Sequence, residues 1–224
     1  MKIVRMAMPL AFLAVSSLTA WAGSTVTLNL TGLQSDEAIE NFFDGGLGGN
    51  GSGPGPSDGI VFSDNSLAII SELDGGGGNF QDNPSGGPVA YFLTGAAATL
   101  DDAGGFTTGF SFYYSSADAG AVTVWSGLDG TGTELASVSL AAQDTTGCVD
   151  PSTAFCNWTE AGAAFAGTAE SVNFGGVENE VGFDEITLGS STAGGSPTPE
   201  PSSLLLLGTG LVGLAGALRR KLAR

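Results

Sequence analysis

The sequence has 224 residues, a formal net charge of −17 and no histidine. Its six lysines and arginines all lie near the two ends, so residues 23–198 carry 22 carboxylates, no cationic side chain and a net charge of −22. That region lacks the cations that bind nucleic-acid phosphates or anionic lipid, so we expect no nucleic-acid partner. The lack of histidine also excludes a serine triad, and two cysteines alone are too few for a zinc site.

The first 22 residues have the pattern of a secretory signal peptide. Lys2 and Arg5 precede an apolar run over residues 6–18, and Ala20-Trp21-Ala22 supplies the small residues that a signal peptidase requires. We expect cleavage after Ala22, which places the following residues outside the cytoplasm.

Residues 23–189 predict one all-β domain, an antiparallel β-sandwich of the jelly-roll type. Helical periodicity is nearly absent, and short alternating runs of β-branched and aromatic residues recur between glycine and aspartate breaks. About ten strands without alternating helices favour two packed antiparallel sheets. The predicted strands are Thr25–Leu30, Ile60–Ser63, Leu67–Ser71, Val89–Leu93, Phe106–Tyr114, Ala121–Trp125, Glu134–Leu140, Ala163–Gly167, Ser171–Phe174 and Gly182–Leu188.

The exception is SDEAIENFF, residues 35–43, which predicts one or two helical turns. Ser35 can cap them, and Ile39, Phe42 and Phe43 can pack against the domain. The glycine-rich stretches 44–59 and 74–78 that follow are predicted loops.

The sequence predicts which side chains point into the core in two segments near the middle of the chain. In FTTGFSFYYSS, Phe106, Phe110 and Phe112 are predicted to point into the core with Tyr114 in phase, while Tyr113 points to the opposite face. Residues 121–140 predict a hairpin, and its second strand keeps its apolar phase only with a bulge after Ala136.

Cys148 and Cys156 are eight positions apart in a turn-like stretch, CVDPSTAFC. In an exported protein, which reaches an oxidising compartment, this spacing predicts a local disulfide.

The last predicted strand carries an acidic pair, Asp184 and Glu185. Strand parity places Asp184 with Ile186 and Glu185 with Phe183, so one carboxylate of the pair points inward. A buried carboxylate in a domain without basic residues needs a metal ion or several hydrogen bonds. Two interpretations stay open: Asp184 binds a structural calcium ion with Glu40 or Asp44, or it accepts backbone N–H bonds at a sheet edge.

Aromatic and carboxylate side chains offer two kinds of function. Trp125 and Trp158, with Tyr91 and Tyr113, are candidates to stack on sugar rings, which predicts a non-catalytic glycan-binding or structural module. The alternative is a glycoside hydrolase that works with two carboxylates. The pairs available for it are Asp101 with Asp102, Glu178 with Glu180, and Asp184 with Glu185.

The C-terminal end has the features of a targeting segment and not of a folded domain. Residues 190–198 predict a flexible linker, and residues 202–218 form an uncharged apolar run of roughly 26 Å as a helix, close to the thickness of a bilayer core. Arg219, Arg220, Lys221 and Arg224 follow at once and are expected to stay cytoplasmic. A last core helix is the alternative, but such helices normally carry a polar face.

The triplet Pro199-Glu200-Pro201, the apolar run and the terminal arginines together resemble the PEP-CTERM sorting signal of Gram-negative, biofilm-forming bacteria. The resemblance covers about Pro197 to Arg224. It implies recognition by an exosortase, a membrane enzyme that cuts near the motif and releases or re-anchors the protein. It therefore implies a transient stay in the inner membrane, followed by a cell-surface or extracellular location.

The domain also resembles a recurring PEP-CTERM-associated module, on the stretches at residues 41–69, 109–116, 126–140 and 172–190. Its closing strand, GFDEITLG, is similar to the last strand of many extracellular jelly rolls, in which an acidic pair helps to hold a structural calcium ion. The setting that the resemblance implies is exopolysaccharide and biofilm. The expected function is a non-enzymatic exported module that is structural or associated with exopolysaccharide.

Overall fold

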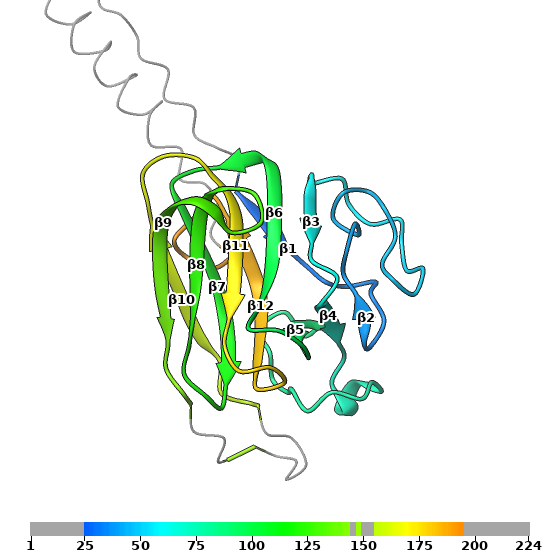
Figure 1. The fold of residues 1–224 in the computed structure, drawn as a ribbon. Coiled ribbons are helices and arrows are strands. Elements are labelled where there is room, and N and C mark those ends of the chain that lie inside the picture. The colour runs from blue at the N-terminus through cyan, green and yellow to red at the C-terminus, as the bar shows by residue number, and fades with distance from the viewer. Residues whose placement is uncertain (1–24, 144–146, 149–154, 195–224) are drawn as a thin grey trace, which may run out of the picture. The chain divides into compact units, whose positions relative to one another are not determined.

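Two antiparallel sheets form from the short alternating segments of the sequence (Figure 1). The computed structural model describes residues 25–143, 147–148 and 155–194. The predicted signal peptide, the apolar C-terminal run and the triplet Pro199-Glu200-Pro201 lie outside these residues. Within the described residues, no helix has the length and apolar character needed to cross a membrane.

The strands divide seven to five between the sheets. The seven-stranded sheet contains β1 (Val26–Leu28), β2 (Glu37–Ala38), β4 (Ser66–Ile69), β5 (Val89–Phe92), β7 (Gly109–Ser116), β10 (Thr159–Ala164) and β12 (Val181–Leu188). The five-stranded sheet contains β3 (Ile60–Phe62), β6 (Ala97–Phe106), β8 (Gly120–Gly127), β9 (Thr131–Leu140) and β11 (Ala169–Gly175). A single 3-10 turn, η1 (Glu72–Asp74), lies between β4 and β5.

Strands β5 to β12 follow the strand order of a jelly roll. The order is β5-β12-β7-β10 in one sheet and β6-β11-β8-β9 in the other, and the chain changes sheet at every step except the β8–β9 hairpin. Strands β1, β2 and β4 extend the first sheet, and β3 extends the second. The predicted all-β antiparallel sandwich is therefore confirmed, with eight of its strands in the double Greek-key order.

Phenylalanine rings fill the space between the sheets. Phe174 of β11 lies 4.8 Å from Phe183 of β12 and 5.8 Å from Phe110 of β7, measured between ring centroids. Phe112 and Tyr114 are also buried in this core, and Tyr113 is not, as strand alternation predicts. The tilted and edge-on ring contacts add to the free energy gained from burial.

Pairing between distant segments changed several strand boundaries. The prediction joined Phe106 to the strand 109–114, but Phe106 ends β6 in the other sheet, and Thr108 between them has a φ of 77°. Most of β6 was missed because its sequence, AATLDDAGGF, has low intrinsic strand preference and is held by pairing with β3 and β11. Strand β10 begins at Thr159 rather than Ala163 because it pairs with β7 over six residues.

The helix predicted over residues 35–43 is wrong. Asp36 and Glu40 have φ angles of 58° and 46°, which an α-helix does not allow. Residues 37 and 38 form β2 instead and pair with β4. Phe42 and Phe43 are buried as expected, but from a series of turns.

Register shifts occur in three strand pairings, β6 with β11, β7 with β12 and β8 with β9, and the last two bear on the predictions. In β9 the partner of Val124 is Ala136 and the partner of Trp125 is Glu134, so Leu135 is the extra residue, one position before the predicted site. In β12 the register shifts between Asp184 and Thr187, where Glu185 has a φ of 46°. This second bulge overturns the predicted parity, because Phe183 and Ile186 both reach the core.

The predicted disulfide is confirmed. Cys148 and Cys156 are bonded, with Cα atoms 5.6 Å apart. The bond anchors Phe155, whose ring stacks on Phe80 at 4.7 Å and whose carbonyl accepts the N–H of Gln81 at 2.9 Å. Phe155, next to Cys156, thus joins the disulfide-bonded segment to the chain around Phe80.

Candidate functional site

The five-stranded sheet has an outer face that points away from the phenylalanine core. Directly paired residues on antiparallel strands point the same way, so the register assigns two neighbouring rows of side chains to this face. We call this surface the Trp125 face, and its members are Thr99, Asp101, Thr123, Trp125, Glu134, Ser137, Ser171 and Asn173.

Trp125 is the one large aromatic side chain in these rows. It is half-buried, and its indole N–H donates to Thr123 Oγ1 at 2.8 Å, within the same strand. Val122 and Val124 alternate with these residues and are fully buried, which fixes the outward direction of the indole. The nearest row carries hydroxyl and amide groups, and Thr99 donates to Asn173 at 2.9 Å.

The β8–β9 turn folds back over part of this face. The N–H of Gly130 donates to Ser171 Oγ at 2.9 Å, and the N–H of Asp129 donates to Asp101 Oδ1 at 2.8 Å. A Cβ at Gly130 would lie 2.2 Å from Asn173 Nδ2, and its φ is 65°, so only glycine fits here. The turn buries Ser171 and narrows the open part of the face to the region around Trp125.

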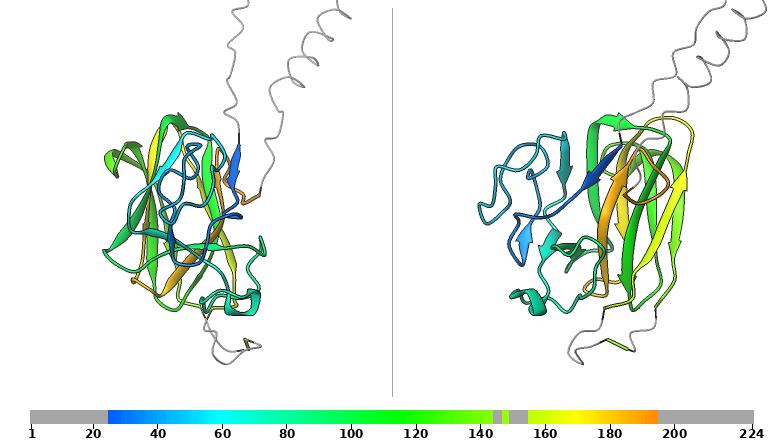
Figure 2. Two further views of the ribbon diagram at one scale, coloured as in Figure 1. Left: turned by 90° about the vertical axis from the view of Figure 1, so that its right-hand side faces the viewer. Right: turned by 180° about the vertical axis from the view of Figure 1, so that it is seen from behind.

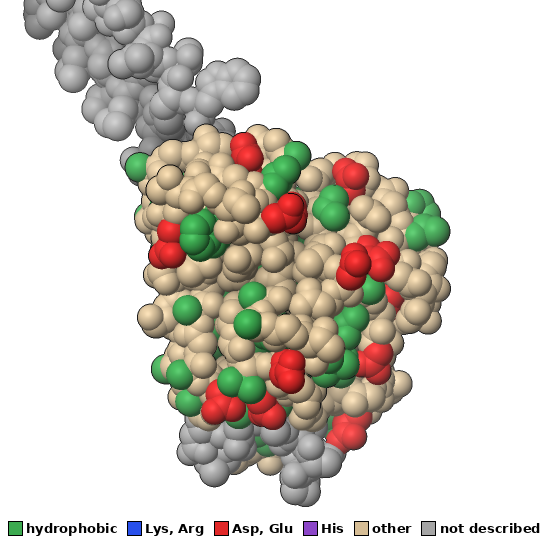
Figure 3. Space-filling model, viewed as in Figure 1, with side chains coloured by type: hydrophobic (Ala, Val, Ile, Leu, Met, Phe, Trp, Pro, Cys, Tyr) green, Lys and Arg blue, Asp and Glu red, His purple; other side chains and the backbone are tan. Residues whose placement is uncertain are grey.

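Carboxylates surround the aromatic side chain. Glu134 is exposed and directly paired with Trp125, and Asp101 lies in the same row two strands away. Burial raises the pKa of Asp101, and the nearby Asp129 carboxylate adds to this although a hydrogen bond from the Asp129 N–H opposes it. Burial, with a contribution from Glu170, likewise raises the pKa of Asp102. Figure 3 shows this side of the molecule with red carboxylates and no blue or purple on the described surface.

The other predicted stacking residues have structural contacts. Trp158 is half-buried, its ring lies 6.0 Å from Phe80, and its indole N–H donates to Gln81 O at 2.9 Å. Tyr91 is buried, and its hydroxyl donates to Asp36 at 2.5 Å. Burial and then this carboxylate raise the pKa of Tyr91 well above its ordinary value. The two tryptophans are therefore in different settings, and the Trp125 face contains only one of them.

Asp184 is buried, as predicted, and its carboxylate accepts three hydrogen bonds. Oδ2 accepts from Asn83 Nδ2 at 3.0 Å and from the Ser85 N–H at 2.8 Å, and Oδ1 accepts from the Glu185 N–H at 2.9 Å. Two of the three donors are backbone N–H groups, as the second interpretation expected, but β12 lies between β5 and β7 rather than at a sheet edge, and the third donor is the Asn83 side chain.

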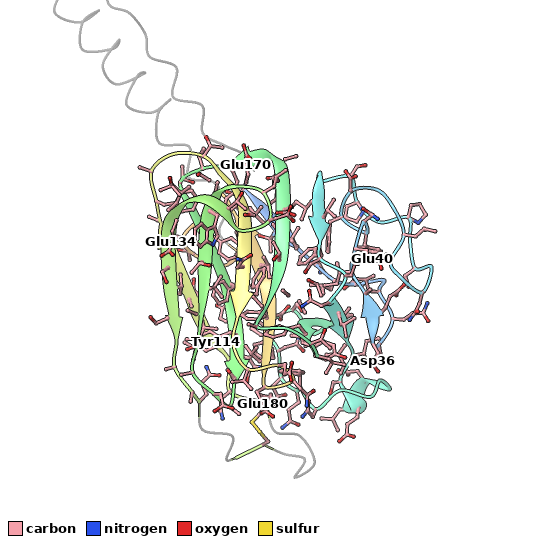
Figure 4. The ribbon with its side chains drawn as sticks, viewed as in Figure 1. Asp36, Glu40, Tyr114, Glu134, Glu170 and Glu180 are labelled. Carbon is pink, nitrogen blue, oxygen red and sulfur yellow. A yellow bond between two sulfur atoms is a disulfide. The ribbon has the colours of Figure 1, made fainter. Side chains whose placement is uncertain are left out.

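Glu40 and Asp44 are not gathered with Asp184 in a metal-binding group. The part of the chain that the structure describes contains no set of three or more Asp, Glu, Cys or His side chains arranged to hold a metal ion. Figure 4 shows Glu40 in the N-terminal stretch beside β2. Calcium binding at Asp184 stays a prediction, which thermal melting with and without a chelator tests.

The three carboxylate pairs considered for hydrolysis differ in their settings. Asp101 and Asp102 are adjacent on β6, and Asp102 Oδ1 accepts the N–H groups of Gly104 and Gly105. Glu178 is exposed and Glu180 half-buried in the turn before β12. In the third pair Asp184 is buried and Glu185 half-buried, and burial followed by the charges of Asp184 and Glu160 raises the pKa of Glu185.

A buried carboxylate that the sequence did not single out organises the glycine-rich loop. Glu37 is fully buried, and its two oxygens accept the N–H groups of Gln34, Asn50 and Ser52 at 2.7 to 3.0 Å. Burial opposes ionisation, but these bonds and one from the Ser52 hydroxyl together lower the pKa of Glu37. A Cβ at Gly48 would lie 2.6 Å from Glu37 Oε1, so the glycines of the loop allow this approach.

The described half of the predicted linker is bound to the outer face of the seven-stranded sheet. The N–H of Ala193 donates to Glu160 at 2.9 Å, that of Gly194 donates to Thr187 at 3.1 Å, and Ser111 donates to the Ser190 carbonyl at 3.0 Å. Residues 190–194 are therefore part of the folded domain, and the rest of the predicted linker, residues 195–198, lies outside the described residues.

Comparisons with known proteins identify a sorting motif at the C-terminal end and two solved structures with low similarity to the domain. No curated protein matches the chain. Among solved structures, CsCBM6-3 from Clostridium stercorarium, determined with cellobiose, is 18% identical with a TM-score of 0.34, over 56% of this chain and 81% of that one. The K3 cleaved adhesin domain of Lys-gingipain from Porphyromonas gingivalis is 15% identical with a TM-score of 0.33, over 56% and 91%. These values are too low to transfer a ligand.

The C-terminal region matches the model of the PEP-CTERM protein-sorting motif over residues 197–221. This match begins three residues after Gly194, the last described residue of the domain. It includes the triplet Pro199-Glu200-Pro201, the apolar run and the first three cations of the terminal cluster. The motif implies export and processing by an exosortase, and the chain therefore carries a PEP-CTERM sorting motif.

Proposed function

We propose that the exported domain is a non-catalytic surface module that associates with exopolysaccharide through the Trp125 face. The observation that carries the proposal is the setting of Trp125, a half-buried indole on an otherwise polar sheet face with its N–H already bonded to Thr123. Sugar rings stack on such aromatic surfaces, and their hydroxyls pair with short polar side chains of the kind found at Thr99, Thr123 and Asn173.

Export supports the same proposal. A protein sorted to the surface by an exosortase meets the polysaccharides of its own cell, and the sorting motif at residues 197–221 implies this route. A domain that holds its ligand on an open sheet face needs no enclosed cavity. The cavity lined by Phe62, Phe92 and Phe174 between the sheets has a volume of only about 10 Å³, enough for one water molecule at most.

Binding to the exopolysaccharide of the producing strain tests the proposal. The full-length protein in detergent is titrated with this polymer, and Trp125→Ala is expected to lower the affinity at least about tenfold, as for loss of a central aromatic contact. Trp158→Ala is the matched control and should leave the affinity of the folded protein unchanged. Equal binding by the native protein and Trp125→Ala would reject the Trp125 face as the site.

The same samples test the absence of catalysis. The polymer is incubated with the protein, and its size distribution is followed over time. We expect no shortening. Shortening that disappears in Asp101→Asn, Glu178→Gln or Asp184→Asn would support the hydrolase alternative instead.

A further inference from the structure

The charge of the domain restricts which glycan the Trp125 face can hold. Residues 23–198 carry 22 carboxylates and no Lys, Arg or His, so an anionic polymer meets repulsion and finds no cation to pair with. Polysaccharides fall into three classes by charge, because their sugar units are anionic, neutral or, where amino groups are free, cationic. The face itself is therefore expected to discriminate among these three classes.

The register places negative charge on both sides of the aromatic side chain. Across the sheet, the row runs from Glu134 on β9 to Trp125 on β8, Ser171 on β11 and Asp101 on β6. Neighbouring strands lie about 4.8 Å apart, so Glu134 lies one strand from the indole and Asp101 lies two strands from it on the other side. Figure 4 labels Glu134 on the edge strand β9, where its carboxylate is exposed.

We propose that the Trp125 face binds a cationic glycan, a polymer of hexosamine units with free amino groups, whose ring stacks on Trp125 while its ammonium group pairs with Glu134. This inference rests on the proposed function. An ammonium group held beside an indole also gains from cation–π attraction.

Two short probes with the same backbone and different charge test the inference. They are the β-1,4-linked hexamer of glucosamine and its fully N-acetylated counterpart, titrated by calorimetry into the full-length protein at about pH 6 and low salt. We expect the glucosamine hexamer to bind roughly tenfold more tightly, because charge pairs are weakly screened at low salt. Alginate oligomers, which are anionic, are expected not to bind.

Variants separate a defined site from diffuse attraction to an acidic protein. Glu134→Gln is expected to weaken binding of the glucosamine hexamer roughly three- to tenfold and to leave the N-acetylated hexamer unchanged. Glu178→Gln removes the same charge from an exposed position in the turn before β12 and is the matched control. An equal effect of both variants would show diffuse attraction and overturn the inference.

The outcomes distinguish the inference from the proposed function. Equal affinity for both hexamers, lost in Trp125→Ala, would overturn the preference for a cationic glycan and leave the glycan-binding face in place. Alginate binding that depends on Trp125 would also overturn the inference. If none of the four ligands, the two hexamers, alginate and the producing strain's polymer, binds in a way that depends on Trp125, both the inference and the proposed function fail.

Discussion

The two outer faces of the sandwich differ in what covers them. On the seven-stranded sheet, Phe80 lies against Gly182, where a Cβ would come within 2.4 Å of its ring, and Asn83 and Ser85 bond to Asp184. Residues 190–194 bond to the same sheet (Figure 2). On the five-stranded sheet the β8–β9 turn folds over part of the outer face, and Trp125 is half-buried. The comparison teaches that similar residues, a tryptophan and a carboxylate on each side, make more stabilising contacts on one face than on the other.

The largest effect expected from this difference is at Asp184. Asp184→Ala would leave the donors of Asn83, Ser85 and Glu185 without their acceptor, and we expect a loss of about 4 kcal/mol in the free energy of unfolding. Asp101→Ala on the other face removes one bond, from Asp129, and should cost about 1 kcal/mol. Urea unfolding followed by tryptophan fluorescence measures both. Similar losses would mean that the two faces do not differ in this way.

The tryptophans give the next contrast. Trp158→Ala removes contacts with Phe80 and the bond to Gln81, so we expect a loss of about 3 kcal/mol in stability. Trp125→Ala should cost about 1 kcal/mol or less, since it leaves the core untouched. The melting temperatures of the two variants, measured beside their glycan affinities, show which tryptophan contributes to stability and which to binding. A Trp125 variant that melts as early as the Trp158 variant would contradict this contrast.

Reduction of the disulfide has a smaller expected effect. Cys148 and Cys156 are eight positions apart, and closing so short a loop in the unfolded chain is worth about 2.6 kcal/mol by the chain-entropy relation. Reduction should therefore lower the melting temperature and increase protease cleavage near Phe80, to which the disulfide segment is bound. Glycan binding on the Trp125 face should persist in the folded, reduced protein.

Titration in acid gives the last contrast. The pKa of Glu37 is lowered, so the stability it provides is complete above the unfolded value of 4.5 and is lost as the pH falls through the folded pKa. The pKa values of Asp101, Asp102 and Glu185 are raised, so these groups destabilise the ionised fold. Protonating them increases stability as the pH falls through their folded pKa values toward the unfolded values of 3.8 for Asp and 4.5 for Glu.

Unfolding free energies measured from neutral to acidic pH should therefore pass through a maximum. Glu37→Gln is expected to lower the free energy of unfolding by about 2 kcal/mol at neutral pH, because a neutral amide accepts fewer of the three backbone bonds. The same variant should lose less of its unfolding free energy as the pH falls below that of the maximum. An unchanged acid limb in this variant would show that Glu37 does not cause the decline.

Much of the molecule could be predicted where local chemistry is decisive. The alternation of apolar residues identified the central strand around Phe110 and Phe112, and the spacing of the cysteines identified the disulfide. The predicted position of the bulge in β9 differs by one residue from the observed position. The prediction came this close because the alternation of apolar residues along the strand requires a bulge there. The site was predicted only in part: Trp125 was named, but its partners Glu134, Asn173 and Thr99 come from other strands.

The sequence by itself determined the class of fold, the charge and the sorting motif, because strand periodicity, the placement of carboxylates and a C-terminal motif are all local properties of the chain. Only the tertiary structure decided that residues 37–38 form a strand, that β6 belongs to a sheet, and that Asp184 accepts its bonds from Asn83 and Ser85. It alone also distinguished Trp125 from Trp158. The physical reason is that burial and hydrogen-bond partners come from segments as far as 160 positions away in the sequence, as for Thr27 and Thr187, and these long-range contacts override local preference.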